Sequence, residues 1–168
     1  MCNGNTLRPV VVGAFAVGKT SLVQRYVHSI FSEKYHTTVG VKVDRKGVVV
    51  NDIPTELIIW DLHGEDEFQS VRMHYLRGAS GCIYVVDGTR EATLNAAFDL
   101  QKRVEEAIGR VPSVLAINKY DLKAQWELDI SLANKMERDD FTVIHTSAKT
   151  GTSVEYAFEA LAAKMVKI

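Results

Sequence analysis

A glycine-containing segment near the N-terminus has the residue types that bind phosphate. Residues 13–20 satisfy the pattern G-x-x-x-x-G-K-[ST]. Gly13 and Gly18 let the backbone curl so that its amides point at phosphate oxygens. The Lys19 ammonium supplies a point charge, and the Thr20 hydroxyl is a potential Mg²⁺ ligand. The pattern predicts a phosphate-binding loop, whose contact residues are Ala16, Val17, Gly18, Lys19, Thr20 and Ser21.

A second segment, Asp61 to Gly64, has the pattern D-x-x-G. The Asp61 carboxylate can hold a Mg²⁺-bound water, and the Gly64 amide can meet a γ-phosphate with no side chain in the way. Because Asp and Gly are common in any turn, this pattern alone is weakly specific. Its interpretation depends on a position close to the phosphate loop.

Two later segments have the groups needed to recognise a guanine base. They are Asn118 to Asp121 and Ser147 to Lys149. The Asp121 carboxylate can accept both the N1–H and the exocyclic amine of guanine, a pair of donors that adenine lacks. The Ala148 amide can donate to the guanine O6, and the stems of Lys119 and Lys149 can cover the faces of base and ribose. The predicted base-binding residues are therefore Asn118, Lys119, Asp121, Ser147, Ala148 and Lys149.

Strands and helices alternate along the chain and place each of these segments after a strand. Short apolar runs predict the strands, and apolar positions at steps of three or four predict the helices. Asn51 and Asp52 suit a tight turn between two strands, which predicts an antiparallel hairpin. The expected strands are 9–12, 41–50, 57–60, 82–86, 113–117 and 142–145, and the expected helices are 19–30, 97–108, 129–136 and 154–165.

This alternation predicts one α/β domain over residues 1–168. We expect a mostly parallel six-stranded sheet with one antiparallel edge pair and helices on both faces. Ligands of such sheets bind at the carboxyl ends of the strands, where all four segments would meet.

Composition excludes several other classes of protein. The chain has 168 residues and a net charge of −1, from 20 Lys and Arg against 21 Asp and Glu. That balance argues against nucleic-acid binding and electrostatic membrane attachment. Two cysteines cannot form a disulfide framework, and no apolar run approaches the ~20 residues that span a bilayer. We expect a cytoplasmic protein and a monomer, with Cys82 as a core residue.

The sequence resembles the Ras superfamily of small GTPases over essentially its whole length, and its Rab-like branch in particular. Thr38 follows Thr20 by 18 residues, as in the first switch of that branch. Further matching segments are Trp60 to Gly64, Tyr75 to Ala79 and Asp87 to Thr89.

The resemblance implies the three-layer P-loop fold and a switch that binds GTP or GDP with Mg²⁺ and hydrolyses GTP slowly. It implies effector and exchange-factor proteins as partners, bound through two switch loops. It further implies Thr20 and Thr38 as Mg²⁺ ligands, Asp61 acting on the metal through water, and Phe31 edge-on to the guanine. The implied catalytic residues are Lys19, Thr38, Gly64 and Glu65.

Two departures from the family pattern leave an alternative open. Glu65 stands where the family has a water-positioning glutamine, and Phe15 stands where it usually has a small residue. A phenyl ring there either occupies the space of a partner's arginine or points to solvent. Both departures favour an interaction module that barely hydrolyses GTP; a further alternative is the nucleotide-binding domain of a larger protein. The chain stops at Ile168 without a C-terminal cysteine, so no lipid anchor is expected in it.

Three other side chains allow a structural or a functional reading. His63 lies beside the predicted γ-phosphate position but is more typical of an exposed loop histidine. Trp60 is a candidate for an exposed aromatic contact with a partner, whereas Trp126 is expected to pack in the interior.

Overall fold

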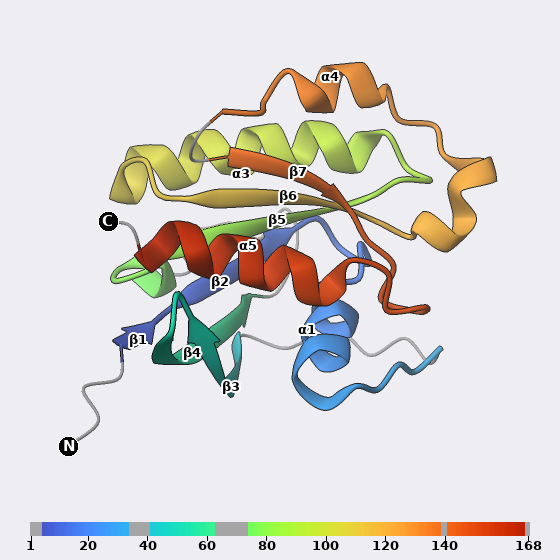
Figure 1. Ribbon diagram of the computed structural model, residues 1–168. Coiled ribbons are helices and arrows are strands. Elements are labelled where there is room, and N and C mark those ends of the chain that lie inside the picture. The colour runs from blue at the N-terminus through green and yellow to red at the C-terminus, as the bar shows by residue number, and fades with distance from the viewer. Residues whose placement is uncertain (1–4, 34–40, 63–73, 139–140, 167–168) are drawn as a thin grey trace.

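A seven-stranded sheet organises the chain (Figure 1). The computed structural model describes residues 5–33, 41–62, 74–138 and 141–166. The strands are β1 (Asn5–Leu7), β2 (Pro9–Gly13), β3 (Val41–Val50), β4 (Ile53–Leu62), β5 (Gly81–Asp87), β6 (Ser113–Asn118) and β7 (Phe141–His145). The helices are α1 (Lys19–His28), α3 (Ala92–Ile108), α4 (Ile130–Asn134) and α5 (Val154–Val166), with short 3-10 helices at His74–Leu76 and Tyr120–Gln125.

The strand order confirms the predicted α/β fold class. The order is β4–β2–β5–β6–β7 with all these strands parallel, and β3 pairs antiparallel with the outer edge of β4. The three-residue β1, which the sequence patterning missed, adds a seventh strand parallel to the start of β4. Because β2, β4, β5, β6 and β7 run in the same direction, their carboxyl ends meet at one edge of the sheet.

The hairpin between β3 and β4 forms where the sequence predicted it. Asn51 and Asp52 have φ values of 51° and 64°, the left-handed conformation that a two-residue type I′ turn requires at both positions. The turn sets a register in which Lys42 lies opposite Asp61 and Val43 opposite Trp60.

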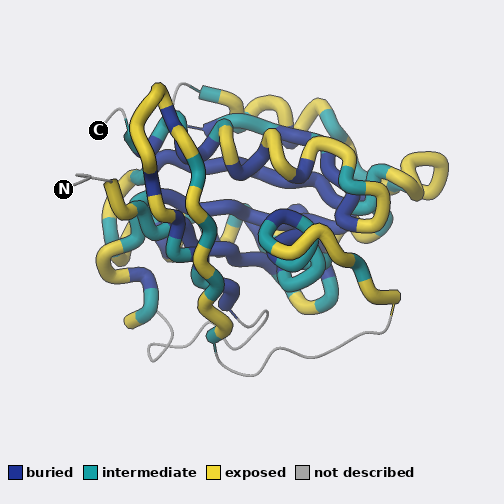
Figure 2. The backbone as a smooth tube through the Cα atoms, turned by 60° about the horizontal axis from the view of Figure 1, so that its bottom comes forward, coloured by how far each residue is buried: buried dark blue, intermediate teal, exposed yellow. Residues whose placement is uncertain are grey.

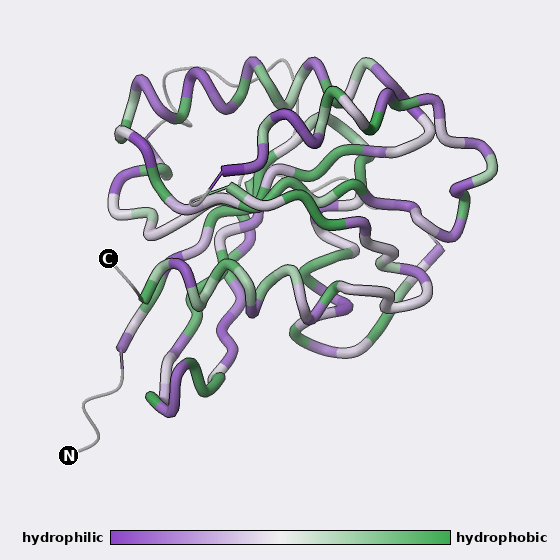
Figure 3. Tube along the Cα trace, turned by 45° about the horizontal axis from the view of Figure 1, so that its top comes forward, coloured by the Kyte–Doolittle hydropathy of each residue, from purple (hydrophilic) through white to green (hydrophobic). Residues whose placement is uncertain are grey.

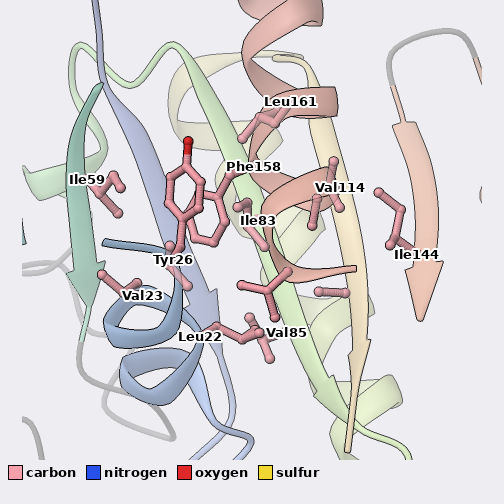
Figure 4. Packing of buried hydrophobic residues seen from close by; sticks show 14 of the residues in the cluster. Leu22, Val23, Tyr26, Ile59, Ile83, Val85, Val114, Ile144, Phe158 and Leu161 are labelled. Atoms are coloured by element: carbon pink, nitrogen blue, oxygen red, sulfur yellow. The ribbon is translucent and has the colours of Figure 1, made fainter. Parts of the chain in front are cut away.

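Helices cover the sheet on both faces, as expected (Figure 1). On one face α1 and α5 close a core in which the rings of Tyr26 and Phe158 stack with centroids 4.2 Å apart (Figure 4). On the other face α3 and α4 pack Leu94, Val104 and Ala133 against the strands. The central strands are therefore buried (Figure 2) and apolar (Figure 3), as parallel strands covered on both faces must be.

Several helix boundaries differ from the prediction, including both ends of α4 and the last residue of α5. The helix α1 ends at His28 rather than Ile30, because Ser29 adopts a left-handed conformation with a φ of 56° and its amide donates to the Arg25 carbonyl. The helix α3 begins at Ala92, five residues before the first predicted position. Cys82 is fully buried as expected, and burial raises the pKa of its thiol to about 12.

Candidate functional site

The predicted phosphate loop connects the end of β2 to the start of α1 at the carboxyl edge of the sheet. Its second glycine, Gly18, has a φ of 102°, which disfavours any residue with a Cβ atom. A Cβ atom there would lie 2.3 Å from Nδ2 of Asn118. At Gly13 it would lie 2.4 Å from the Val85 carbonyl oxygen. Both glycines are therefore required by the close approach of neighbouring strands and loops.

The Lys19 side chain folds back over this loop. Its Nζ donates hydrogen bonds to the Gly13 carbonyl at 2.9 Å and the Ala14 carbonyl at 2.8 Å, and only 7% of the residue is exposed. These bonds hold a positive charge directly over a loop that ends at the N-terminus of α1, where the helix dipole also favours anions. The arrangement is suited to binding a phosphate chain.

Asn118, at the end of β6, joins the phosphate loop to the base-recognition segments. Its Nδ2 donates to the Val17 carbonyl at 3.0 Å. Its Oδ1 accepts from the Ala148 amide at 3.2 Å and from the Thr146 hydroxyl at 3.3 Å. The side chain is 2% exposed, so all these bonds are sheltered from water. One amide group thereby fixes the relative positions of three predicted binding segments.

The base-recognition segments are held together by a second set of bonds. The Ser147 hydroxyl donates to Asp121 Oδ1 at 2.7 Å. Arg25 of α1 donates through Nε to the Ala148 carbonyl at 2.8 Å and through Nη2 to the Lys149 carbonyl. Lys149 in turn forms an ion pair with Glu33 at 3.3 Å. The Asp121 carboxylate is thus held against the Ser147–Lys149 segment, whose Ala148 amide donates to Asn118 in this structure.

Two of the three residues proposed to hold Mg²⁺, Thr20 and Asp61, meet at the end of β4. The Thr20 hydroxyl donates to Asp61 Oδ2 at 2.6 Å, and Asp61 is fully buried. Its Oδ1 has no hydrogen-bond partner among the described residues. The free Asp61 oxygen and the Thr20 hydroxyl oxygen are hard oxygen donors, the kind of atom that Mg²⁺ and its bound waters prefer as neighbours. These two residues fit the metal that the resemblance implies.

Burial also raises the pKa of Asp61 to about 6, although the Thr20 hydroxyl and the charge of Lys19 act in the opposite direction. We expect the metal-free folded chain to retain a proton here that the unfolded chain loses near pH 4. The free energy of unfolding of the metal-free chain should therefore fall by up to ~3 kcal/mol as the pH rises from about 4 to about 6. Urea unfolding in EDTA measures this slope.

Asp61→Asn is the control for that measurement, since an amide cannot titrate and this part of the slope should vanish. A slope identical in both proteins would contradict the assignment. Mg²⁺ favours the ionised carboxylate, so saturating metal should also flatten the slope.

Two phenylalanines that the sequence singled out lie within the described residues. Phe31 lies partly buried against the α1–α5 core, and its contact with a base stays a prediction. The Phe15 side chain is 37% exposed. Thr38, His63, Gly64 and Glu65 lie outside the described residues.

Two side chains support the site although sequence reasoning gave them no role in it. Asp87, at the end of β5, is 1% exposed and pairs with Lys119 Nζ at 2.6 Å. Burial would raise the pKa of Asp87, but hydrogen bonds from Lys119 and Thr89 outweigh it and lower that pKa. The Trp126 indole packs on Gly88 and donates to the Lys119 carbonyl at 2.8 Å. The position of Asp87 at the end of a buried strand was the available sequence signal, whereas nothing local marked Trp126.

Comparison with known proteins agrees with this site. The sequence model of the Ras family matches residues 8–167. The chain belongs to the Ras family. Its relatives include the human Ras-related protein Rab-7b, 34% identical over 94% of this chain and 81% of the relative, and Rab7 of Drosophila melanogaster, 33% identical over 96% and 81%. The GTP-binding protein yptV2 of Volvox carteri is 34% identical over 93% of this chain and 73% of the relative.

These matches confirm the Rab-like branch of the Ras superfamily and make this chain a GTP-binding GTPase. Within the described residues, no helix is long and apolar enough to cross a membrane.

Proposed function

We propose that this Rab-like GTPase is a Mg²⁺-dependent guanine-nucleotide switch that hydrolyses GTP slowly to GDP and phosphate. The observation that carries the proposal is the bridging position of Asn118, whose two ends bind Val17 of the phosphate loop and Ala148 of the base-recognition segment. A nucleotide spanning phosphate loop and base site would contact both segments that Asn118 aligns.

In this proposal the chain contributes orientation and charge rather than covalent chemistry. Lys19 and the backbone amides of the phosphate loop hold the phosphate chain and offset the charge that develops on its terminal oxygens. Asp121, held by Ser147, selects guanine. Bound Mg²⁺ would neutralise charge on the phosphates, with Thr20 and Thr38 as the residues that hold it directly and Asp61 acting on it through water. Water is the nucleophile, and GDP is the leaving group.

Glu65 is proposed to orient the attacking water. An ionised carboxylate can accept a hydrogen bond from water, but its charge also faces the γ-phosphate, which raises the pKa of a carboxyl or pushes it away. This conflict is the reason to expect slow hydrolysis rather than none.

Single-turnover hydrolysis of GTP with Mg²⁺ tests the proposal. We expect a rate on the order of 10⁻⁴ to 10⁻³ per second, as for an unassisted GTPase of this kind. Glu65→Ala should lower that rate about tenfold, with nucleotide affinity preserved as the control. An unchanged rate would remove Glu65 from the mechanism.

A chain that binds GTP tightly but does not consume it would instead support the second candidate, a nucleotide-bound interaction module. Phe15 and Glu65 are the features that favour this candidate.

Partners are proposed to contact the switch segments and the adjoining outer face of the β3–β4 hairpin. Trp60 lies partly exposed on this face, next to Val43, which is 44% exposed. The Arg8 guanidinium covers the Trp60 ring at 3.7 Å, and Tyr75 lies beside it with ring centroids 5.7 Å apart. An aromatic surface of this kind is typical of protein contacts.

A further inference from the structure

Three consecutive carbonyl groups of the phosphate loop are each bound by a side chain from another segment. The Val17 carbonyl accepts from Asn118 at 3.0 Å, and the Ala16 carbonyl accepts from Lys119 at 3.4 Å. The Phe15 carbonyl accepts from Nη2 of Arg90 at 2.7 Å. Asn118 and Lys119 belong to the base-recognition segment. Arg90 lies in the connection between β5 and α3, and no role has been assigned to this residue.

The direction of these carbonyls decides the direction of the neighbouring amides. In a trans peptide unit the C=O and the following N–H point in opposite directions, and no cis peptide occurs in the described part of the chain. The Phe15 carbonyl and the Ala16 amide share one peptide unit. A donor that holds the Phe15 carbonyl on the outside of the loop therefore turns the Ala16 N–H toward the inside, where a phosphate chain would lie.

The conformation of Ala16 shows why the loop needs such a restraint. Ala16 has a φ of 60°, in the left-handed region that a residue with a Cβ atom adopts only when its surroundings hold it there. The peptide units on both sides of Ala16 are held through their carbonyls, by Arg90 before it and by Lys119 after it. Release of either bond frees the strained residue to relax.

Arg90 itself is anchored through a buried neighbour. Its Nε donates to Asp87 Oδ2 at 3.1 Å, and the same carboxylate oxygen pairs with Lys119 at 2.6 Å. The Thr93 hydroxyl, 3% exposed, donates to the Arg90 carbonyl at 2.7 Å and accepts from the Asp87 amide at 2.9 Å. The guanidinium thus starts from a fixed backbone and spans two acceptors, Asp87 and Phe15.

We propose that Arg90 is a positioning residue for nucleotide binding, which fixes the Phe15–Ala16 peptide so that the Ala16 amide faces the phosphate chain. Through Asp87 it also links the phosphate loop to Lys119 of the base-recognition segment. The inference rests on the proposed nucleotide-binding function and adds a residue that controls how slowly the nucleotide leaves.

The test compares Arg90→Ala, Arg90→Lys and the control Lys102→Ala, which removes an exposed cation from α3. Release of fluorescent GDP is measured with Mg²⁺ present. We expect Arg90→Ala to release GDP about tenfold faster, the effect of losing one partly exposed hydrogen bond from a charged donor. Arg90→Lys should release GDP nearly as fast as Arg90→Ala, because one ammonium group cannot bind Asp87 and the Phe15 carbonyl in the geometry of the guanidinium. Lys102→Ala should release GDP at the unmodified rate.

Two further measurements separate positioning from a general loss of stability. The phosphorus NMR spectrum of bound GDP should change in Arg90→Ala, because the amide donors around its phosphates are rearranged. The preference for GDP over ADP should stay the same, because the base contacts are intact.

Each outcome has a distinct meaning. Unchanged GDP release in Arg90→Ala, or a lower melting temperature with an unchanged phosphorus spectrum, would overturn the role of Arg90 alone. If Arg90→Lys released GDP as slowly as the unmodified chain, the positive charge and not the guanidinium geometry would be responsible, which would overturn the positioning role. If the unmodified chain failed to bind GDP, the proposed function would fall and the inference with it.

Discussion

Replacing Gly18 with alanine is expected to abolish tight nucleotide binding while leaving the sheet and helices in place. The added Cβ atom would lie 2.3 Å from Asn118 Nδ2, and the φ of 102° at Gly18 is itself unfavourable for alanine. Asn118 must therefore move, and its bonds to Val17 and Ala148 are lost together. We expect GDP affinity to fall at least 100-fold, the combined effect of two lost buried hydrogen bonds and a distorted loop.

Gly47→Ala is the matched control, because nothing lies within 4 Å of a Cβ atom built there. Its GDP affinity, measured by calorimetry, should equal that of the unmodified chain. Circular dichroism should show the same helix and strand content for both variants. Tight GDP binding by Gly18→Ala would contradict the close approach of loop and Asn118 that the site requires.

Asp121→Asn is expected to transfer the preference of the site from guanine to xanthine. The Ser147 hydroxyl donates to Asp121 Oδ1, so in the variant it would hold the amide oxygen and leave the NH₂ group to face the base. Guanine then loses the acceptor for its N1–H and amine, whereas the 2-oxo group of xanthine gains a donor. We expect GDP affinity to fall roughly 10²–10³-fold, the loss of two hydrogen bonds to a charged acceptor.

Competition between GDP, XDP and ADP on the variant and on the unmodified chain measures this change. Ser147→Ala provides a second comparison, since it frees the Asp121 carboxylate without removing it and should weaken GDP binding only modestly. Equal affinity of the unmodified chain for GDP and ADP would refute the assignment of Asp121 to guanine recognition.

The sequence predicted the fold class and most of its elements because the apolar patterns are strong. The run Cys82 to Val86 is continuous and apolar, as a strand covered on both faces requires, and it lies within β5. Asn51 and Asp52 predicted the hairpin because both tolerate left-handed conformations. The three residues of β1 were missed because a run so short has no periodicity to detect, and only pairing with β4 makes it a strand.

The location of the candidate site could also be predicted from the sequence. The order of the four segments, each after a strand, predicted that Lys19, Asp61, Asn118 and Asp121 would share one edge of the sheet. Those residues do lie there, since parallel strands bring their carboxyl ends together. Local sequence was enough to predict these positions, because each residue type has a definite chemical role and follows its strand at a short, fixed spacing.

The order of residue types along the chain thus identifies which groups could bind a guanine nucleotide and on which edge of the sheet they meet. How those groups are held depends on tertiary contacts. Asp87, Arg90 and Trp126 act through residues distant in the chain, because Asp87 pairs with Lys119, the Trp126 indole packs on Gly88, and Arg90 binds Phe15 across 75 positions. Hydrogen bonds of this kind depend on the meeting of separate loops, and a carbonyl acceptor is present at every residue. No pattern of residue types could therefore have marked the Phe15 carbonyl as the partner of Arg90 in advance.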